Sequence, residues 1–221
     1  MTKLTKHPVT IIFDFDGTIA DTFSFYLDLL NKLADKFNFQ KIAPEKIDYY
    51  RNLSSHDIIK AFQIPRFRLP FVIFEAKRLL RKGIEQIHPI NGIKDTLITL
   101  KTRDILLGII TSNSVRNVNA FLQCNNLPQF EFVISSMRIW EKSRTLKKLI
   151  ISNKLDQNNV FYIGDETRDI EAAHEAGIKS IAITWGYNSE SILKSFSPDY
   201  LISKPDELVE VIDLIVAGSG K

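Results

Sequence analysis

Short apolar runs recur along the chain, and the first of them covers residues 9–13. Most of its residues are β-branched, and it lacks the regular alternation of apolar and polar positions that marks a half-exposed strand. A strand buried on both faces of a parallel sheet has this pattern. Similar runs predict further strands at 105–110, 132–134, 160–163, 180–184 and 200–202.

Apolar residues at helical spacing fill the segments between the later runs. They predict helices at 93–101, 115–124, 143–153, 166–176 and 205–216, with a short helix near Ser191. Gly177 follows one of these segments and is a favourable residue just beyond a helix end. Strands and helices that alternate through short loops predict a parallel sheet with right-handed crossovers.

One section breaks this alternation, because residues 22–91 indicate helix after helix and no strand. Helical spacing covers 23–37, serine residues at 54 and 55 can cap a helix that runs to 62, and a longer helix is expected at 69–82. The expected fold class is α/β, with a Rossmann-like parallel sheet core and an inserted α-helical cap domain. The predicted core domain comprises 1–21 and 92–221, and the cap comprises 22–91.

Composition fits a globular protein, with 221 residues of which 44% are hydrophobic and 25% charged. No apolar run reaches the roughly 18 residues of a transmembrane helix, and the first ten residues lack the apolar core of a signal peptide. The single cysteine, Cys124, excludes an internal disulfide and indicates a reducing cytoplasm. We therefore expect a cytoplasmic protein without a membrane partner.

The formal net charge of +3 is too small to indicate nucleic-acid binding. Lys and Arg outnumber Asp and Glu within residues 22–91, whereas the remainder of the chain is slightly acidic. A basic insert that faces an acidic site would suit an anionic substrate. The same charges could equally form a solvated surface.

Two carboxylates, Asp14 and Asp16, follow the first strand directly and precede Gly17 and Thr18. Residues two apart in an extended segment point the same way, so both acids share one site at the carboxyl end of a strand. Their like charges repel each other, and a divalent cation such as Mg²⁺ would compensate. A solvated Asp-Gly turn is the alternative.

Polar residues also end later strands. Thr111, Ser112 and Asn113 follow one apolar run, where they could bind phosphate oxygens or simply cap the next helix. Lys142 precedes another helix and could pair with carboxylates or with phosphate.

A third strand end carries three acids within the sequence Gly-Asp-Glu-Thr-Arg-Asp. Asp169 lies one helical turn after Asp165 and on the same face. Glu166 could share a metal ion with them or act at the helix start. Several acids that converge on the ends of strands favour a cation.

On these motifs the chain resembles the haloacid dehalogenase-like hydrolase superfamily, in its branch with a helical cap. The matching motifs are DFDGT at 14–18, ITSN at 110–113, Lys142, and GDETRD at 164–169. Phosphoglycolate-phosphatase-like and β-phosphoglucomutase-like proteins are the most similar groups. The resemblance covers nearly the whole chain.

The resemblance implies a role for each motif. Asp14 would be the nucleophile that forms an aspartyl-phosphate, and Asp16 would protonate the leaving oxygen and then activate water. Ser112, or Thr111 in the alternative register, would bind the transferring phosphoryl group. Lys142 would stabilise the developing charge. The implied ligands of Mg²⁺ are Asp14, the carbonyl oxygen of Asp16, Asp165 and, directly or through water, Asp169.

Two departures from the family pattern lie beside the third motif, where Glu141 replaces a common glycine and Arg144 adds a second cation. Within the cap, Arg51 is the first choice for a substrate contact. Further candidates there are His56, Arg66 and Arg68.

The expected activity is Mg²⁺-dependent hydrolysis of a small phosphorylated metabolite. A mutase that returns the phosphoryl group to a sugar uses the same intermediate, and only the cap would distinguish it. A dehalogenase would need the nucleophile alone. A catalytically silent binding protein on the same fold is the alternative from another class.

Overall fold

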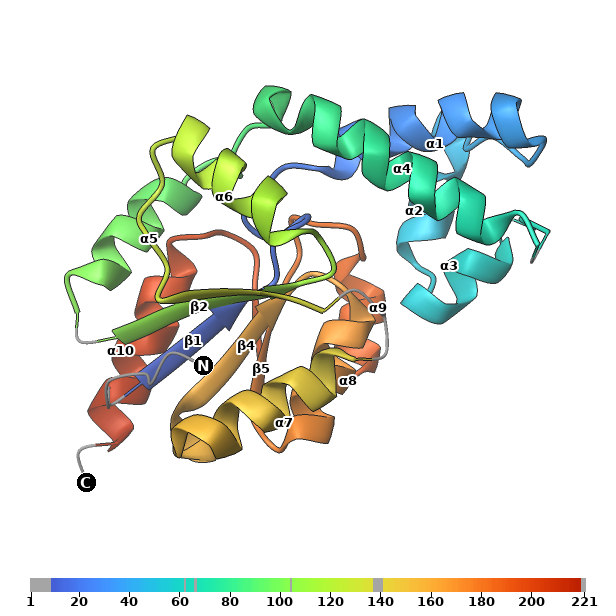
Figure 1. The fold of residues 1–221 in the computed structure, drawn as a ribbon. Helices are drawn as coiled ribbons and strands as arrows, with labels where there is room; N and C mark the ends of the chain where they lie inside the picture. Colours follow the sequence, from blue (N-terminus) through green and yellow to red (C-terminus); the bar gives the residue numbers. More distant parts are fainter. Residues whose placement is uncertain (1–8, 62, 66, 104, 137–140, 220–221) are drawn as a thin grey trace.

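The computed structural model describes residues 9–61, 63–65, 67–103, 105–136 and 141–219. Within these ranges, six strands form one sheet in the order β3-β2-β1-β4-β5-β6, and all neighbouring strands are parallel (Figure 1). The strands are β1 (Val9–Phe13), β2 (Ile105–Thr111), β3 (Phe132–Ser135), β4 (Val160–Gly164), β5 (Lys179–Ile183) and β6 (Tyr200–Ile202).

Strand β1 occupies the centre of the sheet and is buried on both faces. Ile12 lies opposite Gly108 of β2 on one side and Tyr162 of β4 on the other. Alternate residues of β1 pack into different apolar clusters. Val9, Ile11 and Phe13 belong to one cluster, and Ile12 belongs to another. This double burial explains why the run shows no regular polar alternation.

Helices cover both faces of the sheet. One cluster packs α5 (Ile93–Lys101), α6 (Val115–Cys124) and α10 (Glu207–Ser219) against the strands. The other face carries α7 (Lys142–Asn153) and α8 (Thr167–Ala176), while α9 (Glu190–Ser195) packs beside α8 and β5. The α/β fold class expected from the sequence is confirmed.

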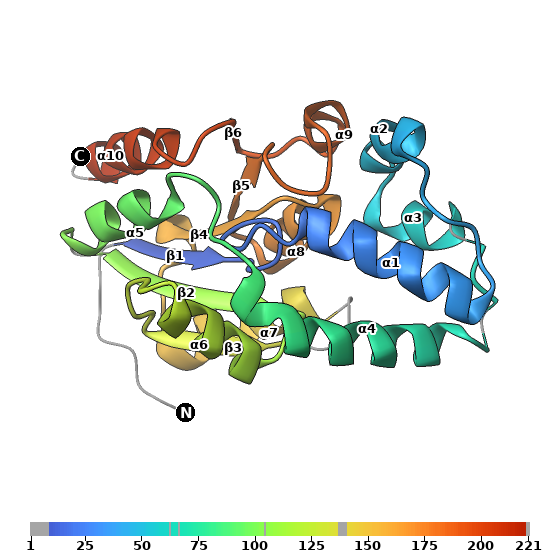
Figure 2. The same ribbon diagram turned by 90° about the horizontal axis from the view of Figure 1, so that it is seen from above.

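Four helices, named here the cap helices, lie beyond the carboxyl ends of the strands (Figure 2). They are α1 (Phe23–Phe37), α2 (Ile47–Arg51), α3 (Ser55–Ala61) and α4 (Leu69–Gly83). The long helices α1 and α4 pack through Leu29, Leu33 and Val72. Helix α2 was not expected from the sequence, because its five residues are too few to show a helical period.

Two linkers join the cap helices to the sheet and run side by side. The amide of Asp21 donates to the carbonyl of His88 at 2.9 Å, and the amide of Ile90 donates to the carbonyl of Ile19 at 2.9 Å. The bridge between Ala20 and Pro89 lies between these bonds. The domain boundaries at 21/22 and 91/92 lie close to these linkers and stay a prediction.

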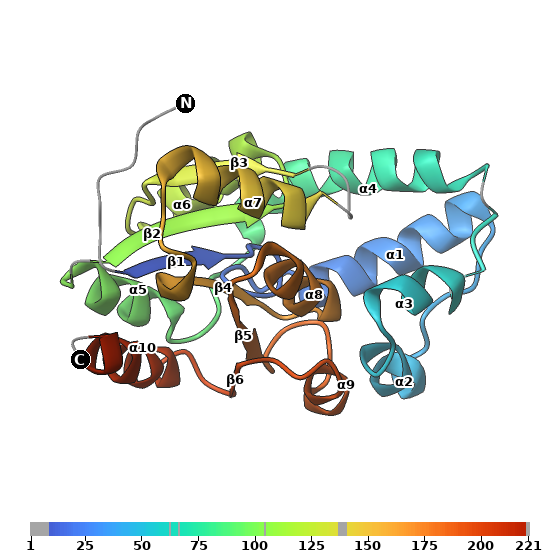
Figure 3. The same cartoon turned by 90° about the horizontal axis from the view of Figure 1, so that it is seen from below.

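A second contact, named here the seam, joins the end of α2 to the loop before α9 (Figure 3). The amide of Ser189 donates to the carbonyl of Arg51 at 2.8 Å, and the hydroxyls of Ser189 and Ser191 each donate to Asn52 Oδ1 at 2.6 Å. Asn188 Nδ2 donates to the carbonyl of Leu53 at 2.9 Å. The cap helices are therefore held at two separate places.

Some predictions fall outside the described residues. These are the absence of a signal peptide as judged from residues 1–8, the helix end at Phe62 and the substrate contact Arg66. Among the residues that the structure does describe, we found no helix with the length and apolar character needed to span a bilayer.

Candidate active site

The loop after β1 is a tight turn that brings Asp14 and Asp16 to the carboxyl edge of the sheet. The amide of Gly17 donates to the carbonyl of Ala20 at 2.9 Å, and the amide of Ala20 donates to the carbonyl of Phe15 at 3.0 Å. Gly17 has a φ of 77°, which favours glycine. A Cβ atom there would overlap the Asp165 carboxylate and the Tyr187 ring.

Lys142, the first residue of α7, is the buried cation of the site. Its Nζ donates to Asp14 Oδ2 at 2.7 Å and to Asp169 Oδ1 at 2.6 Å, and the side chain is 2% exposed. Burial alone would lower the pKa of Lys142, but the charges of Asp14 and Asp169 outweigh it and raise the pKa well above its ordinary value. The ammonium group therefore holds two carboxylates that would otherwise repel each other.

Asp16 is held by an amide side chain. Asn113 Nδ2 lies 3.3 Å from Asp16 Oδ1 and 3.2 Å from Asp16 Oδ2, and Asn117 fixes the same amide by donating to Asn113 Oδ1 at 2.9 Å. Desolvation, followed by the charge of Asp14, raises the pKa of Asp16 from 3.8 to about 7. A carboxyl group with this pKa carries a proton in an appreciable fraction of molecules near neutrality.

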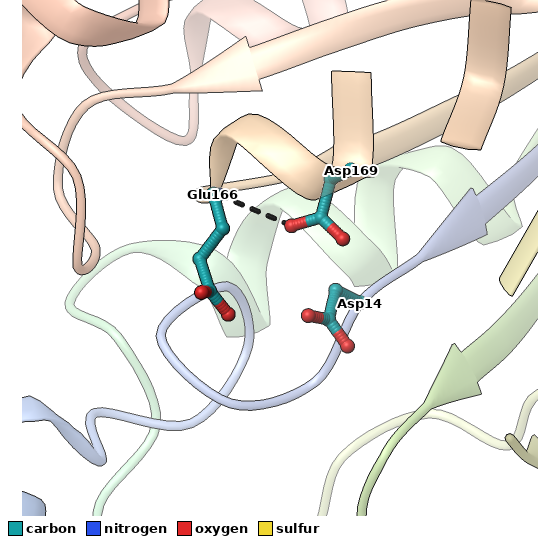
Figure 4. A group of neighbouring side chains, drawn as sticks. All are labelled: Asp14, Glu166 and Asp169. Atoms are coloured by element: carbon teal, nitrogen blue, oxygen red, sulfur yellow. Dashed lines mark hydrogen bonds between the residues drawn. The ribbon is translucent and has the colours of Figure 1, made fainter. Parts of the chain in front are cut away.

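Three carboxylates face one another at the edge of β1 and α8 (Figure 4). Asp14, Glu166 and Asp169 each offer an oxygen, and these atoms lie within 4.8 Å of one another. Asp14 Oδ1 is buried and has no hydrogen-bond partner in the described structure. Burial raises the pKa of Asp169 to about 6, against the opposing charge of Lys142. An acidic cluster with an unpartnered buried oxygen is suited to a hard divalent cation.

Asp165, one of the predicted metal ligands, is buried between two loops. Its Oδ1 accepts the Thr18 hydroxyl at 2.8 Å, and its Oδ2 accepts the amide of Tyr187 at 2.7 Å. Both carboxylate oxygens thus bind the two loops that enclose the site. The cluster of three carboxylates described above does not include Asp165, whose role as a metal ligand stays a prediction. Burial, followed by the charge of Glu166, raises the pKa of Asp165 well above its ordinary value.

Arg168 is a site residue to which the sequence reasoning gave no role. Its side chain is mostly buried and donates to Glu166, and Glu166, Asp169 and Asp14 raise its pKa against the effect of burial. One signal was present in the sequence, since Arg168 is the sole basic residue within Gly-Asp-Glu-Thr-Arg-Asp. A cation there offsets the repulsion among neighbouring acids.

Two cavities, each of about 380 Å³, meet at Asp16, Tyr26 and Ser112. One, named here the basic cavity, lies between α4 and the start of α6 and includes Arg78 and Arg81. The other, named here the apolar cavity, extends among the cap helices and also reaches Glu166 and Arg168. Ser112 lines both, which is the position expected for a group that binds the phosphoryl oxygens.

The remaining predicted residues of the second motif, Thr111 and Asn113, form hydrogen bonds with a main-chain amide and with Asp16, respectively. Thr111 is buried, and its hydroxyl accepts the amide of Asn113 at 3.0 Å. Asn113 orients Asp16 through its amide group. A direct contact of either side chain with substrate stays a prediction.

The predicted cap contacts lie in different surroundings. Arg51 lines the apolar cavity, donates to the carbonyl of Gly186 at 3.1 Å and lies over the Phe23 ring at 5.4 Å. Arg68 donates to the carbonyl of Phe37 at 2.6 Å, and His56 is exposed beside Asp57. A role for Arg51 in substrate binding stays a prediction.

Comparisons with known proteins identify related chains. A family model described as haloacid dehalogenase-like hydrolase matches residues 11–183. Phosphoglycolate phosphatase from Synechococcus elongatus is 32% identical over 203 residues, which are 91% of this chain and 96% of that protein. Pyrophosphatase PpaX from Bacillus mycoides is 20% identical over 93% of this chain and 97% of its own length.

A solved structure shows the same fold. The haloacid dehalogenase-like family protein from Streptococcus pneumoniae superposes with a TM-score of 0.77 at 21% identity, covering 92% of this chain and 98% of that protein. The arrangement of sheet and cap helices therefore has a known counterpart.

Proposed function

Because this chain belongs to the haloacid dehalogenase-like hydrolase family, we propose that it is a phosphatase that hydrolyses small phosphate monoesters. The observation that carries the proposal is the buried Lys142 between Asp14 and Asp169, with Asp16 held beside Asp14 by Asn113. The relatives named above are a phosphoglycolate phosphatase and a pyrophosphatase, which supports phosphoryl transfer.

The first half of the reaction cleaves the ester. A carboxylate oxygen of Asp14 attacks phosphorus and forms an aspartyl-phosphate, while the bond from phosphorus to the leaving oxygen breaks. Asp16 donates its proton to that oxygen, so the alcohol leaves uncharged. Lys142 and the Ser112 hydroxyl stabilise the negative charge on the phosphoryl oxygens.

The second half regenerates the enzyme. A water molecule attacks phosphorus and gives a proton to the carboxylate of Asp16. The bond between phosphorus and Asp14 then breaks, which restores the Asp14 carboxylate and releases inorganic phosphate. Asn113 keeps Asp16 in one orientation for both proton transfers, since the same carboxyl group acts first as acid and then as base.

The acidic cluster would hold Mg²⁺ through Asp14, Glu166 and Asp169, because their oxygens converge and Asp14 Oδ1 lacks another partner. When bound, Mg²⁺ would neutralise phosphate charge and polarise the phosphoryl group. Asp165 supports the site by joining the loops through Thr18 and Tyr187.

We also propose a cytoplasmic location, on the basis of the single cysteine in the sequence.

The test is release of inorganic phosphate from 4-nitrophenyl phosphate and ethyl phosphate, with and without Mg²⁺. Asp14→Asn should lower kcat on the order of a thousandfold or more, because the nucleophile is lost. Asp28→Asn, at an exposed position of α1, is the matched control and should retain activity. Full Mg²⁺-dependent activity in Asp14→Asn would show that the covalent mechanism is wrong.

A further inference from the structure

The apolar cavity indicates what kind of leaving group the phosphate ester carries. This inference rests on the proposed phosphatase function. The cavity starts at Asp16 and Ser112 and continues into the cap helices, so a phosphoryl group bound at Ser112 would direct its ester oxygen toward it. Its volume of about 380 Å³ is within the range of small-molecule sites. The apolar and aromatic lining residues are Phe23, Tyr26, Leu27, Leu30, Ile42, Ile47, Tyr50, Ile58, Ile73, Ala76 and Tyr187.

Three rings, those of Phe23 and Tyr26 in α1 and of Tyr187 in the loop after β5, form one wall of the apolar cavity. Phe23 packs edge-on against Tyr187 at 5.5 Å, and Tyr26 packs edge-on against Tyr187 at 6.0 Å. The Tyr187 hydroxyl is satisfied by Thr22 Oγ1 at 2.9 Å. Because the contacts fix the Tyr187 ring, it presents carbon surface to a ligand with little loss of conformational entropy on binding.

The apolar cavity has two cations among its described lining residues, Arg51 and Arg168. Arg168 donates to Glu166, which offsets its charge, and Arg51 donates to main-chain carbonyls of the loop at 184–186. The Nε atoms of both are buried without a hydrogen-bond partner in the described structure, so each has a donor free for an oxygen atom of the leaving group. The remainder of the lining is mostly apolar.

The basic cavity leaves the same starting point in another direction. It is lined by Arg78 and Arg81, by the polar side chains that follow Ser112, and by Tyr26, Phe74 and Leu80. Arg78 forms a fork with Glu75, with bonds of 2.7 Å and 2.9 Å. Phe74 is 70% exposed at its mouth. Two routes therefore leave Ser112, one past Arg78 and Arg81 and one among the apolar residues of the cap helices.

We propose that the substrate is a phosphate monoester of a predominantly apolar alcohol, with the alcohol portion in the apolar cavity. The length and bulk of the alcohol then determine the specificity, because each methylene buried there leaves water. A short acidic leaving group such as glycolate would leave most of this cavity unfilled.

A homologous series of n-alkyl phosphates from ethyl to hexyl tests the proposal. The alcohols have closely similar basicity, so differences in kcat/KM report binding rather than leaving-group reactivity. Each added methylene should raise kcat/KM about fourfold, mainly through KM. Hexyl phosphate should also exceed phosphoglycolate. A flat series, or a preference for phosphoglycolate, would overturn the proposal.

Matched variants test which of the two cavities holds the alcohol portion of the substrate. Ala76→Leu fills part of the apolar cavity and should lower the ratio of kcat/KM for hexyl over ethyl phosphate at least threefold, with little change for ethyl phosphate. Ile73→Ser, at a 42% exposed lining position, is a second variant with little risk to folding and should have the same effect. Phe74→Ala, in the basic cavity, is the control and should retain the wild-type ratio. Loss of selectivity in Phe74→Ala alone would place the alcohol in the basic cavity and refute the proposal.

Binding measurements separate this proposal from the proposed function. Calorimetric titration of wild-type protein with ethylphosphonate and hexylphosphonate, in the presence of Mg²⁺, needs no turnover. If no ester releases phosphate but hexylphosphonate binds more tightly by tenfold or more, the phosphatase function fails and the apolar site stands. If esters are hydrolysed and both phosphonates bind equally, the function stands and the apolar site is refuted.

Discussion

Replacing Lys142 with methionine removes the cation between two buried carboxylates while keeping a long side chain of similar shape. In the wild type, Nζ lies 2.7 Å from Asp14 and 2.6 Å from Asp169, and all three side chains are at most 3% exposed. Methionine cannot donate to either carboxylate. Asp14 and Asp169 would then face each other in a buried site without compensation, which destabilises the folded state of the metal-free protein.

The size of the effect follows from the burial of the ion pairs. Removing one partner of a buried salt bridge costs about 3–5 kcal/mol, because the remaining charge stays desolvated. For a protein of this length, each kcal/mol lowers Tm by about 2–4 °C. We therefore expect metal-free Lys142→Met to unfold roughly 6–20 °C below the wild type. Mg²⁺ should recover part of this loss, since a divalent cation replaces the missing charge.

The assay is thermal unfolding followed by circular dichroism, in EDTA and in excess Mg²⁺. Lys147→Met is the matched control, because Lys147 is an exposed residue of the same helix and should change Tm by little. Lys142→Arg preserves the charge and should lie between the two. A metal-free Lys142→Met protein with the Tm of the wild type would refute the electrostatic role given to Lys142.

Three further predictions concern the groups around Asp16 and the metal site. Asn113→Ala should lower kcat about tenfold with little change in KM, because it removes the amide that orients Asp16 and removes no contact with the substrate. If steady-state kinetics showed a rise in KM alone, Asn113 would instead bind the substrate directly. Glu166→Gln should weaken Mg²⁺ binding measured by calorimetry about tenfold or more, whereas Asp165→Asn should mainly lower Tm. The reverse pattern would identify Asp165, and not Glu166, as the ligand. In EDTA, Tm should fall as pH rises from 5 to 7, because the folded state keeps protons on Asp16, with a pKa of about 7, and on Asp165 and Asp169, whose pKa values are also raised, while the unfolded state has lost them above about 4. Asp16→Asn should remove the share of that slope that Asp16 contributes, and an unchanged slope would contradict the raised pKa of Asp16.

The sheet and its helices could be predicted because their patterns are local. The apolar run at the first strand and the helical spacing of the segments that became α1, α5 and α6 depend on which faces are buried, and burial selects residue type directly. Helix α2 was not predicted because it is short, and its buried residue Tyr50 packs against distant residues such as Leu27 and Ile58 rather than within a helical period of its own.

The candidate site was predictable to the level of motifs but not of side-chain directions. Asp165 and Glu166 are adjacent, and residues one apart at a helix start point in different directions. Which of them faces Asp14 depends on Tyr187, whose amide binds Asp165 across 22 residues of sequence. No motif marks Tyr187, since a main-chain amide can come from almost any residue. The role of Asn113 likewise depends on its distance to Asp16, across 97 residues.

The paired linkers at Ala20 and Pro89 have a consequence for how such a protein can diversify. The chain leaves the sheet and returns to it at neighbouring points, so the sheet can close whatever length of polypeptide lies between them. The entropy of closing a loop grows only slowly with its length, by about 0.6 kcal/mol for each doubling. Insertions within the loops among α1 to α4 therefore add little closure entropy, provided that the seam and the contacts of Leu80 with the core are kept. Recombination could replace the whole segment that contacts the alcohol while the phosphoryl-transfer groups remain in place, which would let substrate preference evolve independently of chemistry.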